Sequence, residues 1–158
     1  MRQLNTSPLL RIFNGGLLIG TLDLLFAWGF WAPKGASLSR ILQSIAAGWY
    51  GKASYSMGAT SAWVGALSHY AIAAAFVAAY WIAAQRLPAL LKRRILLGAA
   101  YGLLLYVVMN FIVLPLSAAD SPGFDNVPWV ASSIVVHALL GIMCAWFAGR
   151  PAAEPAGS

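Results

Sequence analysis

The sequence predicts an all-α membrane protein: a bundle of four transmembrane helices with one amphipathic helix at the membrane interface. Three observations lead to this fold class. Of 158 residues, 61% are hydrophobic and only 9% are charged, whereas a soluble domain carries about a quarter charged residues. Four apolar runs approach the roughly 20 residues that cross a bilayer as a helix. No alternating pattern indicates barrel strands. We expect one transmembrane domain over 1–149.

The predicted spans are 12–31, 60–84, 95–116 and 129–149. Helix is the expected structure because each backbone group in hydrocarbon must find its hydrogen-bond partner within its own segment. Tryptophans cluster near the ends of these runs, as in the aromatic belt of membrane proteins; they are Trp28, Trp31, Trp63, Trp81, Trp129 and Trp146. Residues 150–158 are rich in Pro, Ala and Gly, which predicts a disordered tail.

The connection between the first two spans contains a predicted amphipathic helix over 37–52. Its apolar residues recur at helical spacing: Leu38, Ile41, Leu42, Ile45 and Trp49. The expected polar face holds Ser39, Arg40, Gln43, Ser44 and Lys52. A segment of this length is too short to span, so we expect it at the interface. It either covers a cavity or anchors the loop.

The distribution of basic residues predicts the orientation in the membrane. One side would hold Arg2, Arg11, Arg86, Lys92, Arg93, Arg94 and Arg150. The other would hold Lys34, Arg40 and Lys52, with Asp120 and Asp125. Since the basic side faces the cytoplasm, we expect a bacterial inner-membrane protein with both termini cytoplasmic. The net charge is +6, and the basic residues lie at the ends of the spans. This position favours binding to lipid headgroups, so we expect a lipid bilayer and not a nucleic acid as the partner.

Each predicted span contains one strongly polar side chain, and these are Asp23, His69, Asn110 and His137. Inserting an aspartate at the middle of a membrane helix costs about 2.5–3.5 kcal/mol. Strongly polar residues in spans therefore usually face other helices or water. Helical phase places Asp23, His69 and His137 on faces rich in small residues. Their expected depth is roughly 9 to 14 Å below the outer surface. The sequence therefore predicts one buried polar cluster in the outer half of the bundle.

Small residues predict where the helices contact one another. Gly16 and Gly20 are spaced four residues apart in the first span, and Gly98 and Gly102 repeat this spacing in the third. Gly141 lies on the same face as His137. Small residues let helix backbones approach closely in lipid. We expect these five glycines at helix–helix contacts.

Three roles for the polar cluster follow from its residue types. It could serve only packing, within a homo-oligomer or a membrane complex, through interhelical hydrogen bonds. It could instead couple protons to the movement of a small solute, with Asp23 beside His69 or His137 and Pro115 loosening the third span. Finally, His69 and His137 could ligate a b-type haem. No metal-site, nucleophile-elbow or phosphate-loop motif is present in the sequence, so we do not expect an enzyme.

Parts of the chain resemble a known group of proteins. They are the segment Gly15 to Asp23, the segment Arg40 to Gly48 and the segment Tyr106 to Pro115. They look like small bacterial inner-membrane proteins with four predicted spans, and more distantly like YagU-type inner-membrane proteins. The resemblance implies location and architecture. It implies no activity, cofactor or site residue, because none is established for that group.

Overall fold

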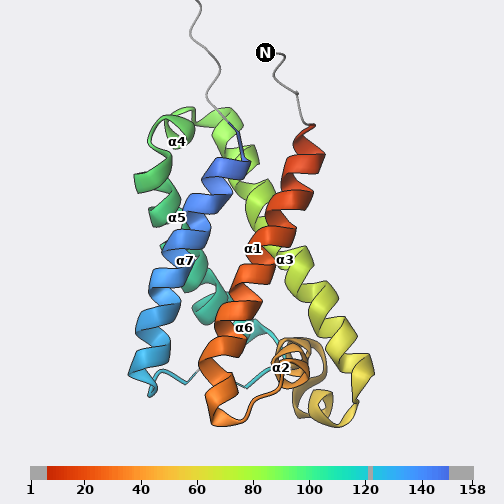
Figure 1. Ribbon diagram of the computed structural model, residues 1–158. Helices are drawn as coiled ribbons and strands as arrows, with labels where there is room; N and C mark the ends of the chain where they lie inside the picture. Colours follow the sequence, from red (N-terminus) through yellow and green to blue (C-terminus); the bar gives the residue numbers. More distant parts are fainter. Residues whose placement is uncertain (1–6, 121–122, 150–158) are drawn as a thin grey trace, which may run out of the picture.

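The computed structural model describes residues 7–120 and 123–149 and is all-α, which confirms the predicted fold class (Figure 1). Four segments in this part of the chain are long and apolar enough to cross a membrane. They are α1 (Pro8–Trp31), α3 (Ala59–Arg86), the continuous run α5 (Arg94–Val108), η3 (Met109–Val113) and α6 (Leu114–Leu116), and α7 (Val127–Phe147). The shorter elements are η1 (Ala32–Lys34), α2 (Leu38–Tyr50), η2 (Gly51–Ser56) and α4 (Ala89–Lys92). The predicted tail 150–158 lies outside the described residues.

Each spanning segment exposes large apolar side chains on its outer face. Examples are Leu17, Leu67, Leu96 and Leu139, which are 49%, 70%, 65% and 55% exposed. The buried set is dominated instead by smaller residues such as alanine, together with a few larger ones. An outer surface of this kind suits hydrocarbon and not water. The chain is therefore a multi-pass membrane protein by the length and hydropathy of its helices.

Glycines bring the spanning helices together in pairs. A Cβ added to Gly16 of α1 would lie 2.6 Å from the Ala74 Cα of α3. A Cβ on Gly102 of α5 would meet the His137 carbonyl of α7, and one on Gly141 would meet the Gly102 backbone. Gly98 and Gly20 are similarly close to α7 and α3. Only a residue without a side chain allows helices to pack this closely.

The end of the bundle that carries α4 is tightly packed. Its core includes Val77, Tyr80, Cys144 and Ala145, each at most 1% exposed. The Tyr80 hydroxyl donates to the Leu90 carbonyl over 2.8 Å, close to the tip where α3 turns into α4. Both described chain ends lie at this same end, opposite α2 (Figure 1). This end therefore closes the bundle.

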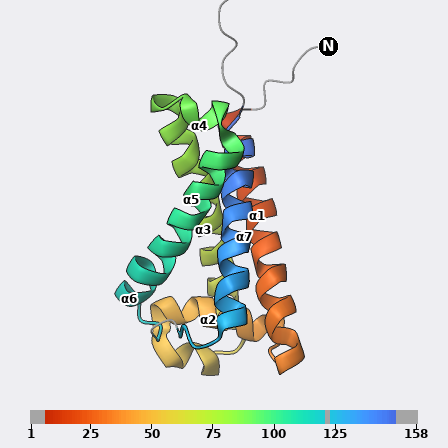
Figure 2. The same ribbon diagram turned by 90° about the vertical axis from the view of Figure 1, so that its left-hand side faces the viewer.

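Helix α2 lies across the opposite end of the bundle, as Figures 1 and 2 show. Its bounds agree with the predicted 37–52 helix, and four of the five predicted polar-face residues are exposed, but the prediction is wrong for Gln43. Gln43 is only 8% exposed and donates to the Gly58 carbonyl over 3.0 Å, whereas Trp49 is 69% exposed. The Ser54 hydroxyl donates to the Gln43 carbonyl over 2.6 Å, and the Ser61 hydroxyl donates to the Ser54 carbonyl over 2.6 Å. These polar groups can be buried because each of them is hydrogen-bonded.

The third span is not a uniform α-helix. Met109–Val113 forms a π-helical turn, in which the Leu114 amide donates to the Met109 carbonyl five residues earlier. Pro115 follows directly and cannot donate a backbone hydrogen bond, so the regular ladder is interrupted here. Figure 2 shows α5 running obliquely from the α4 end, so that α6 lies away from the other spanning helices. The bundle is therefore widest at the α2 end.

Candidate functional site

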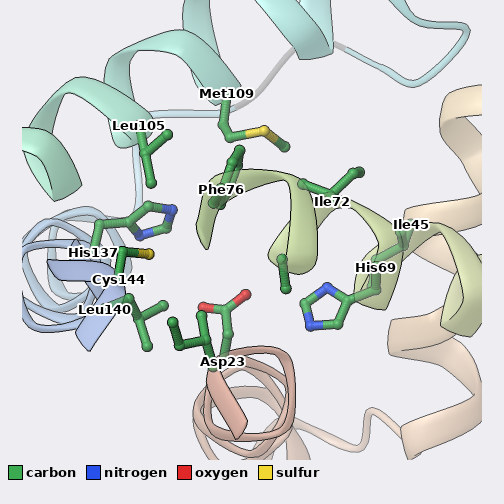
Figure 3. Close-up of a pocket in the computed structure, with 12 residues that line it drawn as sticks. Asp23, Ile45, His69, Ile72, Phe76, Leu105, Met109, His137, Leu140 and Cys144 are labelled. Atoms are coloured by element: carbon green, nitrogen blue, oxygen red, sulfur yellow. The ribbon is translucent and has the colours of Figure 1, made fainter. Parts of the chain in front are cut away.

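Asp23, His69 and His137 line one cavity at the wide end of the bundle. They come from α1, α3 and α7, and the carboxylate of Asp23 lies between the two imidazoles (Figure 3). The inner compartment of this cavity has a volume of about 120 Å³. Apart from these three residues, its walls are mainly apolar: Ile19, Ile45, Ile72, Ala73, Phe76, Leu105, Met109, Leu140 and Cys144.

The three side chains do not form a buried polar cluster. All three are half-buried, and none of them hydrogen-bonds another. The Asp23 carboxylate has no ion-pair or hydrogen-bond partner among residues 7–120 and 123–149, so its oxygens lie more than 4.0 Å from the imidazole nitrogens. The side chains thus surround a space without filling it.

Each histidine is held in place by a backbone carbonyl. His69 Nε2 lies 2.8 Å from the Gly20 carbonyl oxygen, which joins α3 to α1. His137 Nδ1 lies 2.9 Å from the Ser133 carbonyl oxygen, one turn earlier in α7. The edge of the His137 ring also packs against Tyr106, with centroids 5.4 Å apart. These contacts fix both rings relative to the cavity.

A second, outer compartment continues the cavity toward α2. It has a volume of about 210 Å³ and shares Asp23, His69 and His137 with the inner compartment. Ser133 also lines it, at 4% exposure, and its hydroxyl has no hydrogen-bond partner in the part of the chain described. An unsatisfied buried hydroxyl is uncommon and calls for an explanation such as a bound water or ligand. Helical phase places Ser133 on the face of His137, but the sequence does not single it out, because hydroxyls in spans usually bond to their own backbone.

The outer compartment leads to the surface beside α2. A mouth of about 300 Å³ shares four of its lining residues, which are Trp31, Ile41, Ser44 and Trp129. Arg40 and Tyr55 complete the mouth, and the Arg40 guanidinium stacks 3.7 Å from the centre of the Tyr55 ring. Because α2 contributes Ile41 and Ser44 to the path, the helix covers the cavity rather than only anchoring its loop.

Asn110 lies elsewhere. It is half-buried in the π-helical turn, where its Nδ2 donates to the Tyr106 carbonyl over 2.8 Å. It is not among the residues that line the inner or outer compartment. The structure therefore brings together three of the four predicted polar residues. Asn110 satisfies its amide within its own helix.

A separate apolar groove lies between α2, α3 and the α5–α6 segment. Its volume is about 530 Å³, and it borders the inner compartment at Ile45, Ile72 and Met109. No titratable side chain lines it. Its mainly apolar lining suits lipid chains, and the titratable side chains line the neighbouring cavity instead.

The cavity does not fit a haem or a bare metal ion. The Asp23 carboxylate lies between the two imidazoles, where a haem iron would have to sit, and His69 Nε2 is engaged by the Gly20 carbonyl (Figure 3). Within residues 7–120 and 123–149, no three His, Cys, Asp or Glu side chains are close enough to hold a metal ion. The space suits a few water molecules or a small solute.

No family model, curated protein or solved structure matches this chain.

Proposed function

We propose that this chain is a bacterial inner-membrane protein that binds a small polar solute and protons in the Asp23–His69–His137 cavity and couples their movement. The observation that carries the proposal is that three titratable side chains from three spans line one space with a path to the surface. Ionisable residues within membrane spans commonly mark proton or solute pathways. Histidine also changes its charge near physiological pH.

The basic residues support an orientation for this path. Arg11, Arg86, Arg93 and Arg94 belong to the end opposite α2, where both described chain ends lie. Cytoplasmic loops carry the excess of Lys and Arg. In this proposal both termini are cytoplasmic, and α2 with the mouth faces the periplasm. Solute then enters from the outside.

The tightly packed end of the bundle that carries α4 blocks the way from the cavity to the cytoplasm. Val77, Tyr80 and Cys144 fill the bundle between the cavity and the cytoplasmic end. Transport needs a second arrangement in which this core opens and the periplasmic path closes. Four spans form a small bundle, so we propose that the protein works as a homo-oligomer or within a larger membrane complex.

A purely structural role for these residues has two supporting contacts. His69 joins α3 to α1 through the Gly20 carbonyl, and the His137 ring contacts Tyr106 of α5. The Asp23 carboxylate, however, has no hydrogen-bond or ion-pair partner in the described part of the chain. Packing therefore does not account for Asp23.

Proton movement in liposomes tests the proposed function. Purified protein is reconstituted with a pH-sensitive dye inside, and a pH gradient is imposed while the membrane potential is clamped. We expect the wild type to dissipate the gradient and Asp23→Asn to be close to empty liposomes. Asn110→Leu is the matched control, since Asn110 is polar, lies in a span and does not line the cavity. Equal proton flux in the wild type and Asp23→Asn would contradict the proposal.

A further inference from the structure

The hydrogen bonds to the two histidines determine what the cavity offers a ligand. A carbonyl oxygen only accepts hydrogen bonds, so His69 Nε2, at 2.8 Å from the Gly20 carbonyl, must carry a hydrogen and donate. A neutral imidazole has one N–H, and its other nitrogen is an acceptor. His69 Nδ1 is therefore an acceptor when the ring is neutral.

The same reasoning applies to the second ring. His137 Nδ1 donates to the Ser133 carbonyl over 2.9 Å. Its Nε2 is then the acceptor of the neutral ring. Neither His69 Nδ1 nor His137 Nε2 has a hydrogen-bond partner within residues 7–120 and 123–149. Both rings border the space around Asp23 (Figure 3).

Asp23 adds only acceptors and one negative charge. An ionised carboxylate has two acceptor oxygens and no donor. Ser133 contributes a hydroxyl, which is buried without a partner and can accept or donate. The cavity thus presents three groups of acceptors from three helices, and the walls of its inner compartment are otherwise apolar.

We infer that the solute of this cavity is a small protonated amine, either the ammonium ion or a short primary alkylammonium. The inference rests on the proposed function and specifies its substrate class. An ammonium group supplies three or four N–H donors and a positive charge, which matches the acceptor groups and the Asp23 carboxylate. A bare metal ion is not held, since the described side chains do not form a metal site.

Size and wall chemistry agree with this substrate. Water takes up about 30 Å³ per molecule in the liquid, so 120 Å³ suits a ligand of only a few heavy atoms. The outer compartment is walled by Phe26, Trp31 and Trp129. Cations are attracted to the faces of such rings. A short amine can therefore enter past the aromatic wall and reach Asp23.

Protons and the amine compete for the same acceptors. Acidification puts hydrogens on Asp23 or on the free imidazole nitrogens, which removes acceptors and adds positive charge. The surrounding elements carry further ionisable groups, which are Arg11 of α1, Lys34 of η1, Arg40 and Tyr50 of α2, Lys52 and Tyr55 of η2, Tyr70, Tyr80 and Arg86 of α3, Arg94, Tyr101 and Tyr106 of α5, and Cys144 of α7. Of these only Cys144 lines the inner compartment. Because both bind to the same acceptors, uptake of a proton favours release of the amine, and binding of the amine favours release of a proton.

Equilibrium binding to the detergent-purified full chain tests this inference. The probes are ammonium, methylammonium and tetramethylammonium chlorides, with sodium chloride keeping the ionic strength constant. We expect ammonium and methylammonium to bind about tenfold or more tightly than tetramethylammonium, which has the charge but no N–H donor. We expect binding to weaken as the pH falls from 8 to 5, the range over which histidine side chains commonly take up a proton.

Variants connect the binding to the cavity. Asp23→Asn removes the charge and places a donor among the acceptors, so methylammonium binding is expected to fall by about tenfold or more. Ser133→Ala is a second, milder variant with a smaller expected loss. Ser132→Ala is its matched control, because the Ser132 hydroxyl donates to the Pro128 carbonyl over 2.7 Å and does not line the cavity.

The outcomes separate the two proposals. Wild-type proton flux without methylammonium binding overturns the amine inference and leaves the proposed function standing. Amine binding that is lost in Asp23→Asn, without proton flux in the wild type, supports the inference and overturns the coupling to protons. Tetramethylammonium binding as tight as methylammonium binding overturns the hydrogen-bonding basis of the inference.

Discussion

Gly102 is the residue at which the packing of the bundle is most sensitive to a single atom. Its hydrogen faces the His137 carbonyl of α7, so a methyl group at this position must push two backbones apart. We expect Gly102→Ala to destabilise the protein by about 1–3 kcal/mol, as overpacking does. Thermal unfolding in detergent measures the effect.

Gly29→Ala is the control for this prediction. Gly29 is also helical, but nothing lies within 4 Å of a Cβ added there. Alanine favours a helix over glycine, so we expect unchanged or slightly higher stability. Equal destabilisation by both substitutions would contradict close packing at Gly102.

The sequence predicts some of these close contacts and misses others. The four-residue spacing singles out Gly16, Gly20, Gly98 and Gly102. Each of these glycines contacts another spanning helix, which is the kind of contact that this spacing predicts. Gly65 was not singled out, although a Cβ there would meet the Leu42 carbonyl of α2. Its partner belongs to a helix outside the spans, and periodicity within one helix carries no information about such a crossing.

At the scale of elements, α2 is fixed by a chain of hydrogen bonds to η2 and α3. Ser54 is fully buried, donates to the Gln43 carbonyl and accepts from the Ser61 hydroxyl. Removing its hydroxyl by Ser54→Ala costs a hydrogen bond worth about 1 kcal/mol. We expect α2 to open about fivefold more often. Trypsin cleavage at Arg40 and Lys52 should rise by that factor.

Ser39→Ala provides the comparison within the same helix. The Ser39 side chain is exposed and makes no hydrogen bond with the described residues. Its substitution should leave the cleavage rate within error of the wild type. A rate in Ser54→Ala that equals that of Ser39→Ala would mean that the buried chain of hydrogen bonds does not fix α2.

The bounds of the elements follow from the sequence better than their faces do. Apolar runs and caps predict the spans and α2 to within a few residues. The face of α2 is a different matter, since the buried Gln43 side chain donates to the Gly58 carbonyl and the Ser54 hydroxyl donates to the Gln43 backbone carbonyl. Likewise, the expected depth of Asn110 predicts that it joins the polar cluster, but its amide donates to the Tyr106 carbonyl in the same span. Patterns within a single helix decide neither case.

At the scale of the molecule, the bundle is closed at one end and hollow at the other. Composition and helical phase predict a four-span bundle and bring Asp23, His69 and His137 to one cavity. They do not predict that the three side chains stand apart around a space. That spacing depends on how α1, α3 and α7, which carry the three residues, pack against one another, and single-helix patterns do not contain this information.

The position of this hollow end relative to the membrane gives the last prediction. Ser7 and Ser56 are exposed and lie near opposite ends of the bundle, Ser7 before α1 and Ser56 at the end of η2 beside α2. With cytoplasmic termini, a membrane-impermeant maleimide should label Ser56→Cys in intact bacterial cells and Ser7→Cys only after lysis. Cys144 is fully buried, so the wild type serves as the low-background control. Labelling of Ser7→Cys from outside, with Ser56→Cys protected, would reverse the orientation, and the mouth of the cavity would then face the cytoplasm.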